Sequence, residues 1–542
     1  MAKKRVLVLG GGFAGVYAAR ALRRRLGPDY DIELVNDVNY FVFQPFLPEV
    51  AGGLINSADA VTPLRLLLKG VQFRKAEVRA VDLEAKTVTV IQGTRRRLIP
   101  VAYDHLVVAL GQRVDLGRLP GMNEHAYWVK TLADAHELRN HIIDCLEHAD
   151  VTSDAETRER LLNFVVVGAG FSGVETVGEV KELIDHVLVN YRNVGKDEVK
   201  IYLVEMAPRI LNELPEELAA YAQQKLEQRG VEVRLGVGTK TATARRLVLS
   251  DGSVIPTRTI VATIGNVAHP LVEGMGLELE RGRIVVDRFL RAKGREDVWA
   301  VGDAALIPLV ESPSGRDDYA PPTAQFAVRE GGHLAHNLAL SERGGQLRPF
   351  RYRSKGSLAS LGGRRAVAML FGLRLSGFIA WLIWKAFYLS FLPGFATRVR
   401  VLANWVLAAV LPRNIVQIQQ ANRPATRYFH FSKGDLVFEP GMIAQGFYVV
   451  IEGSFELTIE EGGETIVKTF GPGDHFGERV ILGEGLRTGA VRALEDSRVL
   501  IVSRDGFERF ASAFPVLREY FEAYIPRHYP SRAQRVPEEP AT

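Results

Sequence analysis

The sequence of 542 residues holds a single cysteine, Cys145. One cysteine cannot form an internal disulfide, and this count excludes enzymes that work through a redox-active pair of cysteines. The sequence also lacks an apolar leader before its first apolar run, which begins at Val6, so we expect an internal protein on the cytoplasmic side. No cluster of histidine, cysteine and acidic residues has metal-ligand spacing, and we therefore expect no metal site.

Acidic residues are absent from one long segment. Between Arg343 and Gly434 there is no aspartate or glutamate, although arginine and lysine recur throughout. The excess of positive charge, +5 for the whole chain, is concentrated there and is not spread evenly. The sequence also shows no pair of helices of the kind that reads DNA, so we expect no nucleic-acid partner.

Two apolar runs lie inside this acid-free segment, at 378–392 and 399–411, and Pro393 and Gly394 between them end helices. A helix over the first run would rise only about 22 Å, short of the roughly 30 Å of a hydrocarbon core, so it can lie in a membrane surface more easily than span it. Basic residues near the runs would attract anionic headgroups. The alternative is a soluble dimer interface or a cover for a sheet. The aromatic residues that suit a membrane interface are Trp381, Trp384, Tyr388 and Trp405.

One glycine pattern occurs twice in the chain. Each copy follows an apolar, β-branched run that predicts a buried strand, and each opens a helix. The first glycine allows the turn, the second lets the backbone approach a pyrophosphate, and the third lets helix and strand pack closely. Two dinucleotide sites are therefore predicted. The glycines are Gly10, Gly12 and Gly15 in the first copy and Gly168, Gly170 and Gly173 in the second.

The strand after each copy ends in polar residues that would meet an adenosine ribose. In the first copy either Asn36 or Asp37 can accept the ribose hydroxyls. In the second copy Glu205 ends the run 200–205, and its carboxylate accepts both hydroxyls and repels a phosphate, which favours NADH over NADPH. Strands that end at Gly111 and Gly265 close the two domains.

A third element begins near Asp297 as an apolar strand and continues into Gly302 and Asp303. Here the sequence resembles the two-dinucleotide-binding-domain flavoproteins, in which this element returns to the first domain and its aspartate binds the ribityl chain of FAD. The resemblance implies a discontinuous FAD domain with the NADH domain inserted into it.

Further motifs resemble those of type II NADH:quinone oxidoreductases. They comprise Asn39-Tyr40, the run 43–47, Gly173-Val174-Glu175 with Gly178-Glu179, and the run 321–331, and the likeness covers residues 1 to about 415. The chain departs from the family at Arg329, where a second glutamine is usual. The residues that the resemblance places around the cofactor include Phe13, Ala14, Gln44, Ala324 and Gln325.

The resemblance implies hydride transfer from NADH to FAD and then passage of two electrons to a membrane quinone, without proton pumping. Cofactors carry the hard chemistry, so no nucleophile is expected. Glu175 either lies near the flavin and tunes proton uptake, or caps amides at a helix start. Gln325 and Arg329 would share one helix face and contact flavin and quinone; the alternative for Arg329 is an ordinary ion pair. We predict a peripheral homodimer on the cytoplasmic face of the cell membrane.

From Tyr428 onward, short strands alternate with glycine turns and predict an antiparallel β-barrel or jelly roll. The spacing of Gly477 and Glu478 to Arg487 and Thr488 resembles the cyclic-nucleotide-binding domain. That likeness implies a glutamate on the ribose 2′-hydroxyl and an arginine on the phosphate of cAMP or cGMP. The chain departs from the pattern at 479–480 and at Gly489, so the alternative is a structural barrel for dimerisation or docking.

The predicted fold class is α/β, with two Rossmann-like domains, a short apolar helical membrane-association segment and a C-terminal all-β jelly roll. Two alternative functions remain: an NADH-dependent reductase of a soluble electron carrier, which fits Arg329, and a membrane-attached nucleotide-sensing or scaffold protein. The predicted domains are an FAD domain at 1–115 and 285–345, an NADH domain at 116–284, a membrane-association region at 346–425, a cyclic-nucleotide-binding-like domain at 426–525 and a disordered tail at 526–542.

Overall fold

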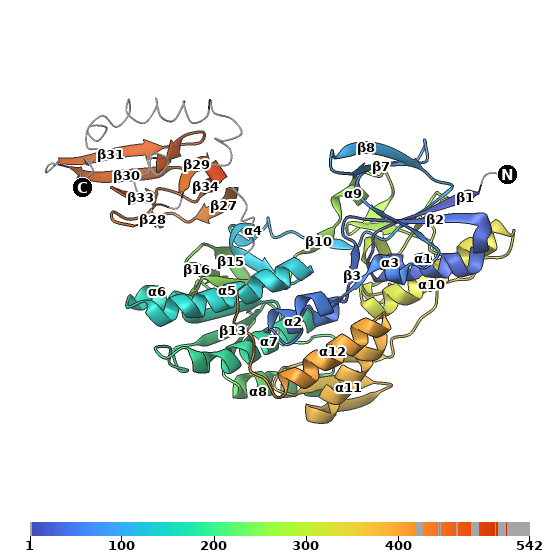
Figure 1. The fold of residues 1–542 in the computed structure, drawn as a ribbon, viewed down its shortest axis with the longest axis horizontal. Coiled ribbons are helices and arrows are strands. Elements are labelled where there is room, and N and C mark those ends of the chain that lie inside the picture. Colours follow the sequence, from blue (N-terminus) through green and yellow to red (C-terminus); the bar gives the residue numbers. More distant parts are fainter. Residues whose placement is uncertain are drawn as a thin grey trace, which may run out of the picture.

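The computed structural model describes residues 3–417, 426–442, 444, 446–461, 464–478, 487–503, 506–507 and 516. Two α/β units lie side by side, and a separate β-rich domain sits beyond the second of them (Figure 1). The predicted tail at 526–542 lies outside the described residues, as does the departure at 479–480.

The first unit is built on a five-stranded parallel sheet in the order β22-β9-β1-β2-β5. Its strands are apolar and buried in the centre, as the predicted strand at Val6 requires. The late strand β22 pairs with β9, so distant parts of the chain complete one sheet. Helices α1 and α10 pack against each other on one face (Figure 1). The bounds are β1 Lys4–Leu9, α1 Phe13–Leu26, β2 Tyr30–Asn36, β5 Gln72–Lys75, β9 His105–Val108, β22 Val298–Ala300 and α10 Ala324–Glu342.

The second unit repeats this plan with a parallel sheet in the order β11-β18-β12-β13-β14. An antiparallel pair, β10 with β19, forms the connection between the two units. The charged stretch between 132 and 162 forms helices α5 and α6. The bounds are β10 Gln112–Val114, β11 Ala126–Trp128, α5 Leu132–Val151, α6 Ala155–Leu162, β12 Asn163–Val167, α7 Phe171–Val187, β13 Lys200–Glu205, α8 Glu216–Gln228, β14 Val231–Leu235, β18 Thr259–Ala262 and β19 Asn266–Ala268.

Smaller elements complete the two units as antiparallel ribbons and short helices. The ribbon strands are β3 Tyr40–Val42, β4 Val61–Pro63, β6 Glu77–Asp82, β7 Thr87–Gln92, β8 Arg97–Ala102, β15 Thr239–Ala242, β16 Arg246–Leu249, β17 Val254–Pro256, β20 Leu279–Glu280, β21 Arg283–Val285 and β23 Ala305–Leu306. The short helices are α2 Leu47–Ala51, α3 Leu64–Leu67, α4 Met122–His125 and α9 Pro270–Glu273.

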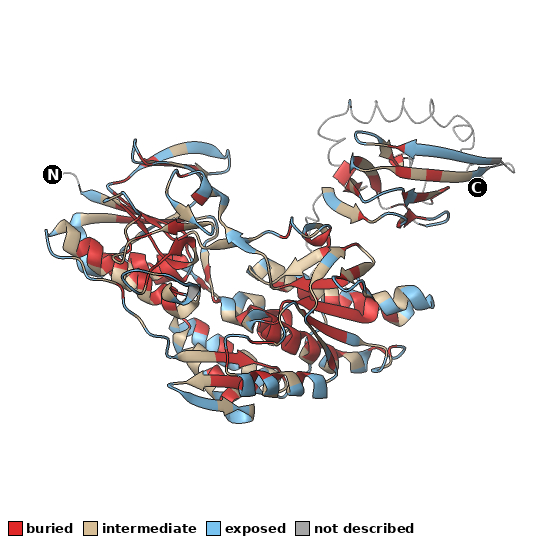
Figure 2. Cartoon of the chain, turned by 180° about the vertical axis from the view of Figure 1, so that it is seen from behind, coloured by how far each residue is buried: buried red, intermediate tan, exposed pale blue. Residues whose placement is uncertain are grey.

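The acid-free segment forms a small sheet, β24 Gly356–Ser360, β25 Ala366–Leu370 and β26 Leu373–Ser376, followed by two helices. These are α11 Gly377–Phe391 and α12 Phe395–Ala408, so the predicted break at Pro393 and Gly394 is confirmed. Large parts of both helices stay exposed, whereas the sheets of the two α/β units are buried (Figure 2). Within the described ranges, no helix combines the length and the apolar character that crossing a bilayer requires.

The C-terminal domain consists of two four-stranded antiparallel sheets, β27-β34-β29-β32 and β28-β33-β30-β31. Phenylalanines from both sheets, including Phe455 and Phe476, fill its core, which explains the alternating apolar pattern after Tyr428. The predicted change to short strands is thus confirmed. The bounds are β27 Thr426–Phe431, β28 Leu436–Phe438, β29 Gly446–Glu452, β30 Phe455–Glu461, β31 Glu464–Phe470, β32 His475–Phe476, β33 Ala490–Ala493 and β34 Ser497–Ser503.

Candidate functional site

The first glycine loop joins β1 to α1 in a form that leaves room for a ligand. Gly10 has a positive φ of 106°, and a Cβ on Gly15 would overlap the Gly10 carbonyl oxygen. A Cβ on Gly12, in contrast, would meet nothing within 4 Å. The first and third glycines therefore serve packing of the chain on itself, whereas Gly12 faces open space at the N-terminus of α1. This arrangement fits a pyrophosphate, which the helix N-terminus attracts.

The second loop has the same geometry between β12 and α7. Gly168 has a positive φ of 97°, and a Cβ on Gly173 would overlap the Gly168 carbonyl oxygen. Nothing lies within 4 Å of a Cβ on Gly170. The two loops are thus equivalent residue by residue, and the geometry of each fits one dinucleotide.

The polar residues that end β2 and β13 accept hydrogen bonds from backbone amides of these loops. The Gly11 amide donates to Asn36 Oδ1 at 2.7 Å, and the Ala169 amide donates to Glu205 Oε2 at 2.6 Å. The amide nitrogen of Asn36 donates to the Val38 carbonyl at 2.9 Å. Asp37 is exposed beside it. Of the two residues that the sequence left open, Asn36 therefore holds the loop. Asp37 lies at the surface, where its Oδ1 accepts from the Val38 amide at 2.9 Å.

The position of Glu205 fits the expected preference for NADH. Its Oε1 accepts the Ala207 amide at 2.9 Å, so the carboxylate is held in place by backbone on both oxygens. The next cation along the loop, Arg209, is turned to Asn212, with Nε 3.1 Å from Oδ1 and Nη2 2.9 Å from the carbonyl. The described residues at this position thus present a carboxylate, which repels a 2′-phosphate.

Glu205→Gln should reduce the preference for NADH over NADPH by about tenfold or more, because a unit charge a few Å from the 2′-phosphate is removed. The measurement is the ratio of kcat/KM values for the two nucleotides. Glu227→Gln, at an exposed position on α8, serves as the control and should leave the ratio unchanged. If the ratio of the Glu205→Gln protein equals that of the wild type, other residues set the preference for NADH.

The third predicted element lies beside the first loop. Asp303 follows β22 in a three-residue 3₁₀ turn, Gly302–Ala304. None of the described residues donates a hydrogen bond to its carboxyl group, and burial raises its pKa. A Cβ on Gly302 would lie 2.9 Å from the Cβ of Ala14, so this turn packs against the start of α1. The free carboxyl group at that position fits a hydroxyl-bearing chain such as the ribityl group of FAD.

A buried acid that the sequence analysis did not assign fixes this turn. The Gly302 amide donates to Glu330 Oε2 at 2.8 Å. Glu330 is fully enclosed, and burial raises its pKa to about 8. It lies in the same run as Gln325 and Arg329, but only the tertiary contact reveals its role.

Glu175 lies two residues after the second glycine loop, and its carboxyl group is buried. Its Oε1 accepts from Trp384 Nε1 at 2.8 Å and from the Ser360 amide at 3.1 Å. Helix α7 begins after Gly170 without a side-chain cap, so the alternative role of Glu175 as a helix cap is wrong. Burial raises its pKa to about 8. Burial therefore favours the protonated carboxylic acid, placed where the second glycine loop meets the acid-free segment.

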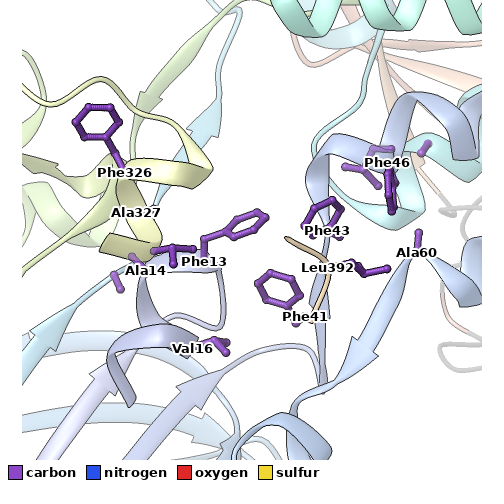
Figure 3. Packing of buried hydrophobic residues seen from close by; sticks show 14 of the residues in the cluster. Phe13, Ala14, Val16, Phe41, Phe43, Phe46, Ala60, Phe326, Ala327 and Leu392 are labelled. Atoms are coloured by element: carbon purple, nitrogen blue, oxygen red, sulfur yellow. The ribbon is translucent and has the colours of Figure 1, made fainter. Parts of the chain in front are cut away.

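Aromatic residues line the space between the first α/β unit and α11. Phe13, Phe41, Phe43 and Phe46 gather there together with Leu392, the residue that follows α11 (Figure 3). The Phe13 and Phe391 rings are 6.4 Å apart and stacked, and a Tyr388 ring lies 4.8 Å from Trp384. These rings form an apolar wall beside Glu175.

The structure corrects the assignment of several aromatic residues to a membrane interface. Trp384 is 1% exposed and bonds to Glu175, and Trp405 donates to Glu49 Oε2 at 2.8 Å. Tyr388 also faces inward, toward Phe43 at 6.0 Å between ring centres. Because α11 is apolar nearly all round, its sequence did not reveal which side would turn to the protein.

Gln325 and Arg329 share one face of α10, as predicted, and Tyr352 joins them. The Tyr352 hydroxyl donates to Gln325 Oε1 at 3.1 Å, and the Arg329 guanidinium lies 5.4 Å from the centre of the Tyr352 ring. Gln325 Nε2 donates to the Gly356 carbonyl at 3.1 Å. No acid among the described residues pairs with Arg329, so the ordinary ion pair is not formed.

The other predicted cofactor residues lie at the rim of this region. Gly111 and Gly265, both with positive φ, flank β10 and β19 where the chain crosses between the two units. Ala324 begins α10, and Gln44 is exposed at the start of the turn before α2.

In the β-rich domain, the predicted nucleotide residues lie together. Glu478 and Arg487 are both buried, and Arg487 donates to the Gly446 carbonyl at 2.6 Å and to the Gly477 carbonyl at 2.9 Å. The guanidinium carbon is 4.2 Å from the centre of the Phe438 ring. Thr488 follows at a half-buried position.

The departure at Gly489 has a structural reason. A Cβ at this position would lie 2.6 Å from the Thr458 carbonyl oxygen on β30. A residue with a side chain therefore does not fit there unless the strand moves.

Comparison with known proteins places these features in families. Residues 4–331 match the family described as Pyridine nucleotide-disulphide oxidoreductase, residues 354–414 match the NDH2 C-terminal domain, and residues 428–514 match the Cyclic nucleotide-binding domain.

Relatives extend over most of the chain. It is 34% identical over 421 residues to the type II NADH:quinone oxidoreductase NdhA of Mycobacterium tuberculosis, which covers 74% of this chain and 86% of the relative. It is 32% identical over 381 residues to a Staphylococcus aureus enzyme of the same description, with 69% and 92% covered. The solved NDH2 of Plasmodium falciparum with NADH is similar in fold, with a TM-score of 0.70 and 19% identity over 76% of this chain and 100% of that one.

Proposed function

This chain belongs to the type II NADH:quinone oxidoreductases. We propose that separate parts of it bind the nucleotides, the quinone and the membrane surface in one flavin-dependent reaction. The enzyme oxidises NADH and reduces a quinone, and FAD, when bound, accepts the hydride and passes on two electrons.

The glycine loops are the proposed holders of the two nucleotides. Gly12 and the N-terminus of α1 take the FAD pyrophosphate, and Asp303 accepts hydrogen bonds from the ribityl hydroxyls. Gly170 and the start of α7 take NADH, and Glu205 accepts from its adenosine ribose. The open space at each middle glycine and the unbonded Asp303 carboxyl group support this assignment.

Glu175 is the observation that carries the proposal for the quinone end. It is the buried acid that meets the NADH loop, the aromatic wall and α11 at once. A carboxylic acid there can hold a proton for the quinone as it is reduced. Gln325 and Arg329, fixed through Tyr352, would position the acceptor. A reductase of a soluble carrier leaves the exposed apolar helices without a role.

The exposed faces of α11 and α12 are the proposed membrane-binding surface. On each helix the exposed apolar residues recur at helical spacing, and no acid lies in either helix. We propose a peripheral attachment through these faces, on the cytoplasmic face of the membrane. The residues of this surface are Phe378, Ile379, Leu382, Phe395, Val399, Leu402, Val406 and Leu407.

The β-rich domain is proposed to be a jelly roll that binds a cyclic nucleotide. Binding would then change the activity of the two nucleotide-binding units. The domain contacts α4, which leads from the β10 crossing strand into the second unit: the His430 amide donates to His125 Nε2 at 3.1 Å. Ion pairs join Arg246 to Asp435 at 2.7 Å and Arg498 to Glu124 at 3.0 Å. A shift of β27 would therefore act next to the connection between the two nucleotide-binding units.

Arg487→Gln should weaken cyclic-nucleotide binding by about 100-fold or more, because a guanidinium fork matches the phosphate oxygens. Basal NADH oxidation should stay unchanged. Calorimetric titration with cAMP and cGMP measures the binding, and Arg492→Gln on the same domain serves as the control. If wild-type protein binds a nucleotide but its kinetics do not change at saturation, the regulatory role is wrong. If it binds neither, the barrel is structural.

The activity itself is tested with purified, FAD-loaded protein, NADH and a water-soluble short-chain quinone, beside a one-electron dye. Fast turnover with the quinone supports the proposed acceptor site. Turnover with the dye alone would mean that the physiological acceptor is not this quinone. Arg329→Gln would then be the first variant to examine. The homodimer stays a prediction, which sedimentation of the detergent-solubilised protein tests.

A further inference from the structure

One short strand, β28, joins the predicted nucleotide residues of the β-rich domain to the second α/β unit. Its last residue, Phe438, has its ring centre 4.2 Å from the guanidinium carbon of Arg487. The other end of β28 follows Asp435, whose Oδ1 accepts from Arg246 Nη2 of the second unit at 2.7 Å. The three residues of β28 therefore connect the predicted phosphate-binding arginine with the interface between the two domains.

Arg487 is bonded to backbone carbonyl groups that a phosphate would replace. Its guanidinium donates to the Gly446 carbonyl at 2.6 Å and to the Gly477 carbonyl at 2.9 Å. A cyclic phosphate would compete for these donors, because a charged acceptor forms the stronger hydrogen bond. The guanidinium would then shift against the Phe438 ring on which it packs, and the pocket end of β28 would respond.

Asp435 is held through both its side chain and its backbone. It is 9% exposed, and its Oδ2 accepts from the Ser432 amide at 3.0 Å. The Ala493 amide donates to its carbonyl oxygen at 2.9 Å. Ala493 ends β33, the strand that begins shortly after Arg487. Both strands that adjoin Arg487 thus fix the position of Asp435.

The ladder between β28 and β33 is irregular. Leu436 lies opposite Arg492. Phe438 lies opposite the preceding residue of β33, so Val437 is an extra residue on β28. Such a bulge leaves one residue unpaired and locally disrupts the ladder. A change at the pocket end of β28 can therefore reach its interface end without the opening of a regular ladder.

On the second unit, Arg246 leads toward the connection between the two α/β units (Figure 1). Its carbonyl oxygen accepts from the Thr243 amide at 2.9 Å, and the preceding residue, Ala242, donates to the Pro120 carbonyl at 2.9 Å. A Cβ on Gly121 would lie 1.8 Å from the Ala242 carbonyl oxygen. The ribbon that holds Arg246 is therefore packed directly on the chain before α4.

That chain continues from β10, one strand of the connection between the two units. The Asp115 amide donates to the Gly265 carbonyl at 2.9 Å, and a Cβ on Gly265 would lie 2.4 Å from Leu116 Cδ2. The connection sets how the second unit stands against the first. Hydride transfer depends on this placement, since a displacement of about 1 Å can cost about 100-fold in rate. None of these contacts involves Trp384 or Ser360 at the proposed quinone end.

We propose that the ion pair of Asp435 with Arg246 couples the β-rich domain to hydride transfer from NADH to FAD. A bound cyclic nucleotide displaces Asp435 through β28, and Arg246 carries the displacement to the connection between the two units. The coupling rests on the proposed function of the β-rich domain, which is nucleotide binding through Arg487. It goes beyond that function because it assigns the effect to one contact and to the NADH half-reaction, and not to the quinone half-reaction.

The test follows flavin absorbance in the FAD-loaded full chain by stopped flow, one half-reaction at a time. With saturating cAMP or cGMP, the rate of flavin reduction by NADH in the wild type should change by about fivefold or more, the lower end of coupling between two sites. The rate of flavin reoxidation by a short-chain quinone should change by less than about twofold. Arg246→Gln should lower the effect on flavin reduction to less than about twofold, although calorimetric titration still shows nucleotide binding.

Further variants separate this contact from general loosening of the β-rich domain. Asp435→Asn should act like Arg246→Gln, and the double variant should show no additional loss, because both changes remove the same contact. Arg246→Lys should restore part of the response. Arg498→Gln is the matched control: it makes the same change in the same interface, where Arg498 pairs with Glu124 at 3.0 Å, and it should keep the wild-type response.

Three outcomes would overturn the coupling. They are a full response in Arg246→Gln, an equal loss of response in Arg498→Gln, and an effect of the nucleotide on the quinone half-reaction alone. If the wild type binds neither cAMP nor cGMP, the proposed function of the β-rich domain fails, and the coupling fails with it. If the wild type binds and responds while Arg246→Gln and Asp435→Asn respond equally well, only the coupling through this ion pair fails.

Discussion

Glu175→Gln should lower quinone reduction by about 100-fold while electron transfer from NADH to a one-electron dye stays within about twofold. Glutamine keeps the shape and the hydrogen bond from Trp384, but it cannot release a proton. Dye reduction needs no proton from this position, so the two acceptors separate proton delivery from hydride transfer. Parallel steady-state assays of wild type and variant measure the effect. Equal losses with both acceptors would place Glu175 at the NADH step.

The pH dependence of the wild type follows from the same group. Burial raises the pKa of Glu175 to about 8, so the proton-carrying form is present below that pH and disappears above it. Quinone turnover should therefore fall above pH 8, whereas dye turnover stays flat. Trp384→Phe removes a hydrogen bond that stabilises the ionised form and should move this fall to higher pH.

Trp381→Phe is the matched control, because it makes the same change on the same helix and Trp381 has no bond to Glu175 within the described residues. A fall at the same pH in both tryptophan variants would mean that another group controls the profile.

The nucleotide loops could be predicted from sequence because their signals are local. Glycine spacing, a preceding apolar run and a polar strand end all lie within a few dozen residues, and β13 begins and ends where expected. The bracing role of Asn36 could not be predicted, since it depends on a hydrogen bond from Gly11 across the loop. Local pattern identifies Asn36 and Asp37 as candidates, and which of them accepts the ribose hydroxyls stays a prediction.

The quinone end was only partly predictable because its contacts join distant parts of the chain. Glu175 meets Ser360 and Trp384, and Glu49 meets Lys385, across hundreds of residues. A lysine in an apolar helix resembles any other interfacial lysine until its acid partner is known. The same holds for Glu330, whose role depends on the Gly302 amide.

Leu382→Glu combined with Leu402→Glu should release the enzyme from membranes. These side chains are 47% and 49% exposed, one on α11 and one on α12. Burial of each leucine in lipid contributes about 1.5–3 kcal/mol, so loss of both should weaken partitioning by roughly 10²- to 10⁴-fold, before the cost of burying two charges is added. Flotation with vesicles that contain anionic lipid measures the partitioning. Turnover with a quinone dissolved in the vesicles should fall accordingly, whereas turnover with a water-soluble quinone should persist.

Val151→Glu with Val189→Glu is the matched control, since these valines are 82% and 83% exposed at the ends of α5 and after α7, away from α11 and α12. The same change in charge there should leave vesicle binding intact. The control therefore shows whether weaker binding comes from the lost apolar contact or from the lower net positive charge of the protein. If the α11 and α12 variant still floats with vesicles, these faces do not bind lipid. If it also changes from dimer to monomer in detergent, the apolar faces form a subunit interface, which is the alternative that the acid-free sequence leaves open.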